Sequence, residues 1–389
     1  MSEVYSYKIT AGSEQAYSQM LKDSVLDILR KTNTDVKQKK ILVKPNMLGA
    51  FEPSRGATTD PRLIEAIVDV LSDEGAGEIF VGDSPGGVEK GIVSTASKCG
   101  LYQASKGHFI NFNENVRMLP VKSRFIKKIS IAGIVNDVDL VINVPKLKTH
   151  GYMGMTGCIK NMFGIIVGPG KAKLHFKAPN VMQFAELLVD IFQIRVPDLH
   201  IVEALTVMEG TGPTSGPLQK LDMVIAGKDG VAVDTVMARM MGFEQDMIRY
   251  ISIANKRGLG ESDIDKISIH GNFGVEHDFD KPVTYTVSEV KKQGIGFNTK
   301  GLTYLYQLGT MVPKLIRPDA CNKCRRCVVN CPAQAITLND LPDVDYKKCI
   351  SCFCCSELCH QNCYEILDNS EAFTNIFSSF EGDDGNKNE

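Results

Sequence analysis

Residues 321–332 read CNKCRRCVVNCP, and residues 349–360 read CISCFCCSELCH. Each run has the spacing C-x₂-C-x₂-C-x₃-C, and together they hold nine of the chain's twelve cysteines. Three cysteines on one tight loop can each reach a different iron atom of a cubane cluster. The fourth iron needs a ligand from elsewhere, and Pro332 turns the chain towards the other run. The spacing therefore predicts a pair of iron–sulfur sites.

The predicted ligand sets cross between the two runs. This spacing is typical of bacterial two-cluster ferredoxins, in which the fourth cysteine of each motif ligates the other motif's cluster. We expect one 4Fe–4S cluster on Cys321, Cys324, Cys327 and Cys359, and a second on Cys349, Cys352, Cys355 and Cys331. Zinc sites usually use paired C-x₂-C elements, and disulfide frameworks suit short secreted chains, so both alternatives fit less well.

Three residues depart from the usual pattern. His360 stands where a proline commonly follows the fourth cysteine of the second motif. Cys354 lies between two predicted ligands, so its side chain is expected to point away from the cluster. Cys363 competes with Cys359 as a ligand. If they are not ligands, Cys354 and Cys363 are small buried residues, which is the usual environment of a free cysteine.

Composition and charge exclude two classes of partner. A formal net charge of −2 leaves no basic excess to neutralise phosphates, so no nucleic acid is expected. The N-terminal residues MSEVYSYKITAGSEQ do not form a signal peptide, and no stretch reaches the 18 or so apolar residues of a membrane span. Thiolate ligands need reduced cysteines. We therefore expect a cytoplasmic protein with no membrane partner, in a cell that lives largely without oxygen.

Short apolar runs alternate with helical patterns before the cysteine runs. Strands are predicted at 41–43, 78–81, 139–144, 199–204, 223–226 and 266–269. Helices are predicted at 14–34, 59–71, 181–195 and 231–241, and another follows GDSPGG at 82–87 and ends at about 98. This alternation predicts an α/β fold in which a mainly parallel sheet is flanked by helices.

The chain divides into four predicted segments. Residues 1–290 form the α/β domain, and residues 291–317 form a connector with an amphipathic piece around 302–308. Residues 318–368 form a small α+β ferredoxin-type domain with two clusters. Residues 369–389, ending in EGDDGNKNE, form an acidic, disordered tail.

Polar residues recur where the predicted strands end. Ligands of open α/β sheets bind beyond the carboxyl ends of the strands. The residues at such ends here are Lys44, Asn46, Asp83, Ser84, Lys146, Lys148, Thr149, His150, Glu203, Glu209 and Asp229. Five strand ends that carry charged groups beside glycine or proline predict one shared cleft.

Residues 140–185 contain six lysines, two histidines and six glycines, but no Asp or Glu. Glycine lets backbone N–H groups approach a ligand, and lysine supplies positive charge, so a phosphate or carboxylate site is predicted. The predicted anion-binding residues are Lys44, Asn46, Asp83, Ser84, Lys146, Lys148, His150, Lys160, Asn161, Lys171 and His175. Two alternatives stay open for this stretch, a basic loop that docks an acidic partner and a merely solvated loop.

Motifs that name a reaction are missing. The chain has no G-x-x-x-x-G-K-[ST] loop, and GDSPGG at 82–87 is not a G-x-S-x-G elbow, so Ser84 is a weak candidate nucleophile. Asp83 with Asn46 is a candidate cation site. Cys158 is either a nucleophile or a packing residue, and packing is favoured. The catalytic residues therefore stay unassigned.

Several stretches resemble one family. They are VKPNMLG at 43–49, TTDP at 58–61, GDSPGG at 82–87, NVPKLKTHGYMGMTGCIKNMFG at 143–164, MEGTGPTSG at 208–216 and GKDGVAVDT at 227–235. They are similar to the family called domain of unknown function 362. In several members of that family, a two-cluster ferredoxin module with a sequence like CFCCSELC follows this domain. The resemblance implies this architecture and these cofactors but no reaction. Cys363 takes a position usually held by a small residue, which favours Cys359 as the ligand.

Two functions follow as hypotheses. The first is an iron–sulfur electron-transfer protein whose two clusters pass single electrons to or from an anionic substrate, cofactor or partner protein held by the α/β domain. If it is an enzyme, it is an iron–sulfur oxidoreductase. The second is a non-redox enzyme or anion-binding module whose clusters act as a scaffold or an oxygen or redox sensor. A ligand that is reduced through the clusters should perturb their spectra on binding.

Overall fold

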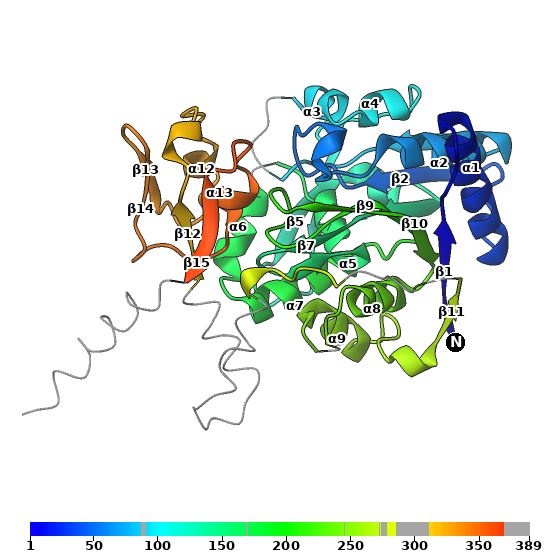
Figure 1. The fold of residues 1–389 in the computed structure, drawn as a ribbon. Coiled ribbons are helices and arrows are strands. Elements are labelled where there is room, and N and C mark those ends of the chain that lie inside the picture. Colours follow the sequence, from blue (N-terminus) through cyan, green and yellow to red (C-terminus); the bar gives the residue numbers. More distant parts are fainter. Residues whose placement is uncertain are drawn as a thin grey trace, which may run out of the picture.

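Figure 1 shows a computed structural model of the chain, which describes residues 1–86, 91–168, 170–244, 246–271, 273, 278–284 and 311–368. The predicted amphipathic piece at 302–308 and the predicted tail at 369–389 lie outside the described residues, as does most of the predicted connector.

The α/β part is built on one large sheet with the order β11-β1-β10-β9-β6-β2-β3. Its strands are β1 (Ser2–Lys8), β2 (Lys40–Pro45), β3 (Glu78–Val81), β6 (Leu140–Val144), β9 (Leu199–Met208), β10 (Leu218–Gly227) and β11 (Ile267–His270). Strands β3, β2, β6 and β9 run parallel, while β10 is antiparallel to both β9 and β1. A short pair, β7 (Lys146–His150) and β8 (Gly154–Thr156), attaches to β9.

Helices cover both faces of this sheet (Figure 1). One face carries α1 (Glu14–Lys31), α2 (Pro61–Asp73), α3 (Ile92–Lys98) and α4 (Leu101–Ala104). The other face carries α5 (Cys158–Asn161), α7 (Val181–Phe192), α8 (Gly230–Met240) and α9 (Arg249–Lys256). Along β2, Ile41 and Val43 join the apolar cluster on the first side and Leu42 joins the cluster on the second, as alternation along a strand requires. The predicted α/β fold with a mainly parallel sheet is confirmed.

Capping residues mark where several predicted helices begin. The side chain of Asp60 accepts a hydrogen bond from the Arg62 N–H, and Pro61 takes the first position of α2. Asn180 caps α7 in the same way by accepting from the Gln183 N–H. Helix α7 ends at Phe192, three residues before its predicted end.

The direction of β10 corrects the predicted cleft. Because β10 runs against its neighbours, the residue that follows it lies at the opposite edge of the sheet from the ends of β2, β3 and β6. Asp229 therefore lies outside the cleft, where it accepts hydrogen bonds from the N–H groups of Val231 and Ala232 and caps α8. Glu203 lies inside β9, because that strand continues to Met208.

Several strands of the α/β part were absent from the sequence-based prediction. The segment after β6 forms β7 rather than a loop, and β1 and the hairpin of β4 (Val116–Pro120) and β5 (Lys128–Ala132) are additional. Charged and polar residues interrupt β1, β4 and β7, so these segments lack the apolar run by which strands were predicted.

The cysteine-rich module is small and packs on the α/β part. It contains β12 (Met311–Leu315), α12 (Arg326–Val329), β13 (Ile336–Leu338), β14 (Pro342–Val344), α13 (Cys354–Glu357) and β15 (Tyr364–Asp368). Strand β12 pairs with β15, and β13 pairs with β14. Met311, Phe353 and Ile366 belong to the same buried cluster as α7 and α8, so the two parts share a core.

Among the described residues, no helix combines the length and the apolar character that crossing a membrane requires.

Candidate functional site

The two cysteine runs follow the same backbone path, 28 residues apart from Cys321 to Cys349. Non-glycine residues with positive φ recur at matched positions, Lys323 and Ser351, Arg325 and Phe353, Gln334 and Asn362. The helices α12 and α13 begin at the same offset. Left-handed backbone is uncommon outside glycine, so its recurrence means that the same turns bend each loop around a centre.

Each bent loop, together with one cysteine of the other run, surrounds a cavity. Cys331, Cys349, Cys352 and Cys355 line one cavity, here called the inner cavity. Cys321, Cys324, Cys327 and Cys359 line a second, here called the outer cavity. The structure thus brings together the two sets of four cysteines that the sequence analysis grouped.

The donor chemistry of both cavities fits an iron–sulfur group. The N–H of Ala335 lies 3.2 Å from Cys331 Sγ, and the N–H of Cys363, its counterpart in the repeat, lies 3.3 Å from Cys359 Sγ. Such N–H groups stabilise a thiolate. Burial, followed by neighbouring cysteines, raises the pKa of Cys355 well above its usual range. A bound metal centre supplies the positive charge that holds such sulfurs as thiolates.

In the described part of the chain, no three His, Cys, Asp or Glu side chains lie close enough together to hold a single metal ion.

The two surplus cysteines each lie beside a predicted ligand. Cys363 is buried at the outer cavity, and burial followed by Cys359 raises the pKa of its thiol to about 12. Cys354 is buried at the inner cavity, and its interaction with Cys352 and its burial raise its pKa well above the usual range.

At the carboxyl ends of β2 and β3, Lys44 and Asp83 form a buried ion pair. Lys44 Nζ lies 2.8 Å from Asp83 Oδ1, and Asp83 Oδ2 accepts from the Met47 N–H at 2.7 Å. Burial lowers the pKa of Lys44, and Asp83 counteracts this effect. Gly164 packs directly on the pair. Asp83 is thus engaged by a lysine, which disfavours the candidate cation site.

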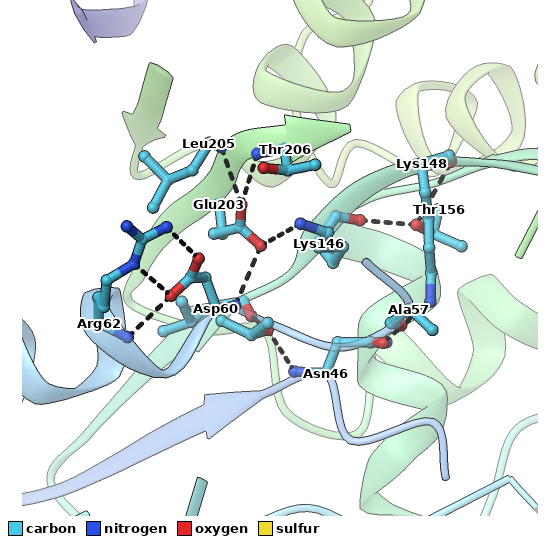
Figure 2. A network of polar contacts seen from close by, with 12 residues as sticks. Asn46, Ala57, Asp60, Arg62, Lys146, Lys148, Thr156, Glu203, Leu205 and Thr206 are labelled. Atoms are coloured by element: carbon cyan, nitrogen blue, oxygen red, sulfur yellow. Dashed lines mark hydrogen bonds and ion pairs between the residues drawn. The ribbon is translucent and has the colours of Figure 1, made fainter. Parts of the chain in front are cut away.

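Figure 2 shows how Lys146 and Lys148 are held. Lys146 Nζ donates to Glu203 Oε2 at 2.6 Å, and the same carboxylate accepts from the N–H groups of Asp60 and Leu205. Lys148 Nζ donates to the carbonyl of Ala57 and, at 3.2 Å, to Asn46 Oδ1. Both lysines are buried, so they tie β7 to neighbouring segments.

The other predicted anion-binding residues also lie at this edge. Lys171, on α6 (Gly170–Lys177), donates to the carbonyls of Ser84 and Pro85, and burial lowers its pKa to about 7. Asn161 joins strands by donating to Asn143 Oδ1 at 2.8 Å and accepting from Asn46. His175 is buried and stacks on Phe184 with ring centroids 4.1 Å apart.

Helix α13 of the cysteine module covers this edge. His150 Nε2 lies 3.1 Å from Glu357 Oε1, within ion-pair distance but outside hydrogen-bond geometry. His150 Nδ1 accepts from the N–H groups of Tyr152 and Met153, so its proton is on Nε2, facing Glu357. Burial, followed by Lys160, lowers the pKa of His150 well below its usual range, which keeps the ring neutral.

Lys160 differs from the other predicted lysines. It lies on α5 and is half-buried. Burial lowers the pKa of its amine, while Glu357 and Cys354 counteract this effect. Its charge therefore interacts with groups of both the sheet edge and the inner cysteine motif, since it also affects His150.

Sequence reasoning missed the residues that join the two parts. Glu357 and Phe353 lie between predicted ligands and were counted only as spacer residues. The rings of Tyr152 and Phe353 meet edge-on with centroids 6.1 Å apart, and Asn362 accepts from Arg55 and from Ser215. The sequence did offer one indication of this contact. Phe353, an apolar residue of the kind that is usually buried, stands where the first run has Arg325.

Cys158 is a packing residue in this structure. It is buried beside α8, and burial followed by Asp234 raises the pKa of its thiol well above its usual range. Its N–H donates to Asp234 Oδ1 at 2.6 Å. A thiol held in its protonated form is a poor nucleophile, so packing is favoured over catalysis.

Gly164→Ala is expected to break the buried Lys44–Asp83 pair. A Cβ there would overlap Asp83 Oδ1 and lie 2.6 Å from Lys44 Nζ. We expect a loss of about 3 kcal/mol in the free energy of unfolding, because disrupting a buried pair leaves a charge uncompensated. The thermal unfolding midpoint measures this loss. Gly170→Ala is the control, since a Cβ at Gly170 meets nothing within 4 Å. Equal midpoints for the two variants would contradict the expectation.

Lys171→Met tests the buried amine through pH. The folded pKa is about 7 against an ordinary value of 10.5, so between these values the unfolded chain binds more protons at this site. The stability of the native protein therefore gains a rising contribution as pH increases from 7 to 10.5. Lys171→Met should flatten this rise in the unfolding midpoint, and Lys173→Met, at an exposed position, should retain it. Parallel curves for all three proteins would be incompatible with a depressed pKa.

Two solved structures match part of this chain. A protein from Thermotoga maritima has a TM-score of 0.36 and 12% identity, with 61% of this chain and 59% of that chain covered. The lactate racemase apoprotein from Thermoanaerobacterium thermosaccharolyticum has a TM-score of 0.37 and 14% identity, with 58% of this chain and 53% of that chain covered. The match spans less than two thirds of either structure.

Sequence comparison is more informative. A thylakoid-associated protein of Synechocystis sp. is 30% identical over 222 residues, which make up 57% of this chain and 68% of that protein. A family model described as a 4Fe-4S binding domain matches residues 315–336, so the chain is an iron–sulfur protein. The model described as domain of unknown function (DUF362) matches residues 41–239, and this chain therefore belongs to that family, as the resemblance predicted.

Proposed function

We propose that this protein transfers electrons through two 4Fe–4S clusters, one at each cavity, to or from an anionic group held at the edge of the α/β sheet. The observation that carries the proposal is the contact of α13 with that edge. Glu357, two residues after the inner-cavity cysteine Cys355, lies 3.1 Å from His150. The inner cavity is therefore next to the predicted anion-binding residues rather than at a remote surface.

The protein's own residues would shield and orient the inner site. Clusters of this kind supply one-electron chemistry at potentials set by hydrogen bonds, charge and exposure. The lining of the inner cavity, apart from its cysteines, is apolar, with Pro313, Ile336, Val344 and Phe353 among its members. Such a lining excludes water from the sulfurs. Phe353 also packs against Tyr152, which fixes the inner motif on the α/β part.

Lys160 is the cation best placed for an anionic ligand. Lys44, Lys146, Lys148 and Lys171 are buried and donate to protein oxygens, whereas Lys160 is half-buried. Its charge acts on Glu357 and on His150. A carboxylate or phosphate beside Lys160 would lie close to the inner motif, which is the geometry that electron transfer to a bound ligand needs.

Electron paramagnetic resonance of the anaerobically purified, dithionite-reduced protein tests the function. Two magnetically interacting clusters with about eight iron atoms per chain are expected, because two ligand sets of four cysteines are present. Iron and sulfide are measured on the same sample. Zinc in place of iron, or iron that dithionite cannot reduce, would refute electron transfer and leave the scaffold hypothesis.

Cys359→Ser and Cys363→Ser separate the ligand from the surplus thiol. Cys363 matches Ala335 in the repeat, a position that supplies an N–H to the neighbouring sulfur, so Cys363→Ser should leave the iron content unchanged. Cys359→Ser should lower the iron content and perturb the resonance of one cluster. The reverse result would reassign the ligand.

Lys160→Met tests the anionic ligand with inorganic phosphate as the probe. A ligand that binds only the folded state raises the unfolding midpoint, so phosphate should stabilise the native protein. Lys160→Met should remove this effect, while the control Lys177→Met, at an exposed position on α6, should keep it. Equal stabilisation of both variants by phosphate would place the anion elsewhere.

A further inference from the structure

The two cavities differ sharply in charge. The outer cavity is lined by Lys323, Arg325 and Arg326 and by no acidic residue. The inner cavity is lined by no charged side chain other than its cysteines. The cations lie in one loop, residues 322–326, which we call the basic loop. Lys323 and Arg325 are exposed, and within the described parts of the chain neither forms an ion pair or hydrogen bond through its side chain.

The repeat shows that this charge is not needed to build the cysteine loop. Lys323 and Ser351 share one left-handed position, and Arg325 and Phe353 share the next. The backbone therefore accepts serine and phenylalanine where the basic loop has cations. Phe353 is buried against the α/β part, whereas Arg325 points to solvent. The outer motif thus presents charge where the inner motif presents a packing surface.

A predicted ligand of the outer cavity reaches the same surface. Cys324, between Lys323 and Arg325, is exposed, while its counterpart Cys352 is buried. A partner that covers the basic loop would therefore come within contact of the cavity wall. Electron transfer between proteins needs such a short approach, and exposed cysteine sulfur gives it.

More cations surround the loop, and they outnumber the acidic side chains beside it. Arg55 and Arg317 both donate to Asn362, and Arg326 contacts His360, whose ring lies 4.3 Å from that of Phe51. These contacts hold the neighbouring charges in place. Among the acidic side chains beside this surface, Asp319 lies in the turn before Cys321 and Glu52 pairs with Lys98 at 3.4 Å. Asp340 and Asp343 are exposed next to the lining residues Leu338 and Pro342. The surface is therefore basic on a chain whose net charge is −2.

We propose that the basic loop is the docking surface for a small acidic protein that carries a one-electron centre. The proposal rests on the electron-transfer function proposed above and names the site at which electrons enter or leave. In the reducing direction the carrier loses one electron to the outer site and is oxidised, and no covalent bond changes. The inner site then faces the sheet edge, so the two ends of the module serve different partners.

Physical considerations favour an acidic protein as the occupant. Opposite charges steer diffusional encounter and raise the association rate at low salt. Electron-transfer complexes are small interfaces that form and dissociate quickly, so a patch of a few cations suffices. Exposed Val329 and Ile316 add apolar area beside the charges, as in the core of a protein interface.

The test uses the complete, cluster-loaded protein and a small acidic two-cluster ferredoxin as the probe. Calorimetric titration measures the dissociation constant, and stopped-flow absorbance measures the rate of electron transfer from the reduced probe. Lys323→Asn with Arg325→Asn removes both charges, and asparagine tolerates the left-handed backbone. We expect binding about tenfold weaker at low salt, because two exposed charges are removed from the interface, and a similar fall in the association rate. Raising the salt should weaken the wild type and leave the variant nearly unchanged.

Lys347→Asn with Lys348→Asn is the matched control. It removes the same charge from two exposed lysines of the same module, beside Cys349 of the inner motif. The control should bind like the wild type, and carbodiimide should cross-link Lys323, but neither of these lysines, to probe carboxylates. Equal weakening in both variants, or a basic probe such as cytochrome c binding as tightly as the acidic one, would overturn the proposal.

Iron content and resonance spectra separate the two possible failures. Normal, reducible clusters with charge-independent binding would refute the docking surface alone. Clusters that are absent or cannot be reduced in the wild type would refute the electron-transfer function itself. If the double variant loses iron, the single variant Lys323→Asn and the salt dependence of wild-type binding still decide the outcome.

Discussion

Burying a charged lysine in a protein interior is costly unless its ammonium group is hydrogen-bonded or paired with oxygen atoms. This constraint organises the edge of the sheet. Lys44, Lys146, Lys148 and Lys171 are all buried there. Lys44 forms an ion pair with Asp83. The other three donate to a carboxylate or carbonyl of another segment, and together these contacts link the ends of β2, β3 and β7 to their loops. The stretch that was predicted to bind an anion is therefore also the internal scaffold of this edge. Its glycines, such as Gly164, leave room for these pairs.

This scaffold explains how the cysteine module can pack on the α/β part without burying unpaired charges. The paired lysines present little free charge to the covering helix, and α13 contributes one carboxylate, Glu357, towards them. Phe353 supplies the apolar contact beside it. The inner motif therefore matches both the charge and the hydrophobicity of the edge that it covers. The outer motif, on the same backbone, is left to face solvent.

The repeat thus separates two tasks that share one geometry. Matched left-handed residues bend both loops, and matched N–H groups point at Cys331 and Cys359. What differs is the side chain carried at each turn, with cations outside and an aromatic ring inside. Membership of the DUF362 family assigns no reaction, so the difference between the two ends of the module is the most direct guide to function.

The sequence by itself determined the parts of this protein that depend on local spacing. Cysteine periodicity identified the iron–sulfur motif, and the alternation of apolar runs with helical patterns identified the α/β fold with a mainly parallel sheet. It also located the polar residues at the ends of β2, β3 and β6, since parallel strands carry such residues to one edge. Tertiary structure alone decided which of these residues are available to a ligand.

Long-range pairing is the physical reason for that limit. Whether a lysine is free or paired depends on partners such as Glu203, which lies 57 residues from Lys146. The direction of β10 depends on its neighbours, and it moved Asp229 to the opposite edge, a reversal that no local pattern encodes. The contact of His150 with Glu357 likewise arises only when the module folds onto the sheet. The residue types and their spacing are set by the sequence, whereas the burial of each side chain and its interaction partners depend on the three-dimensional packing.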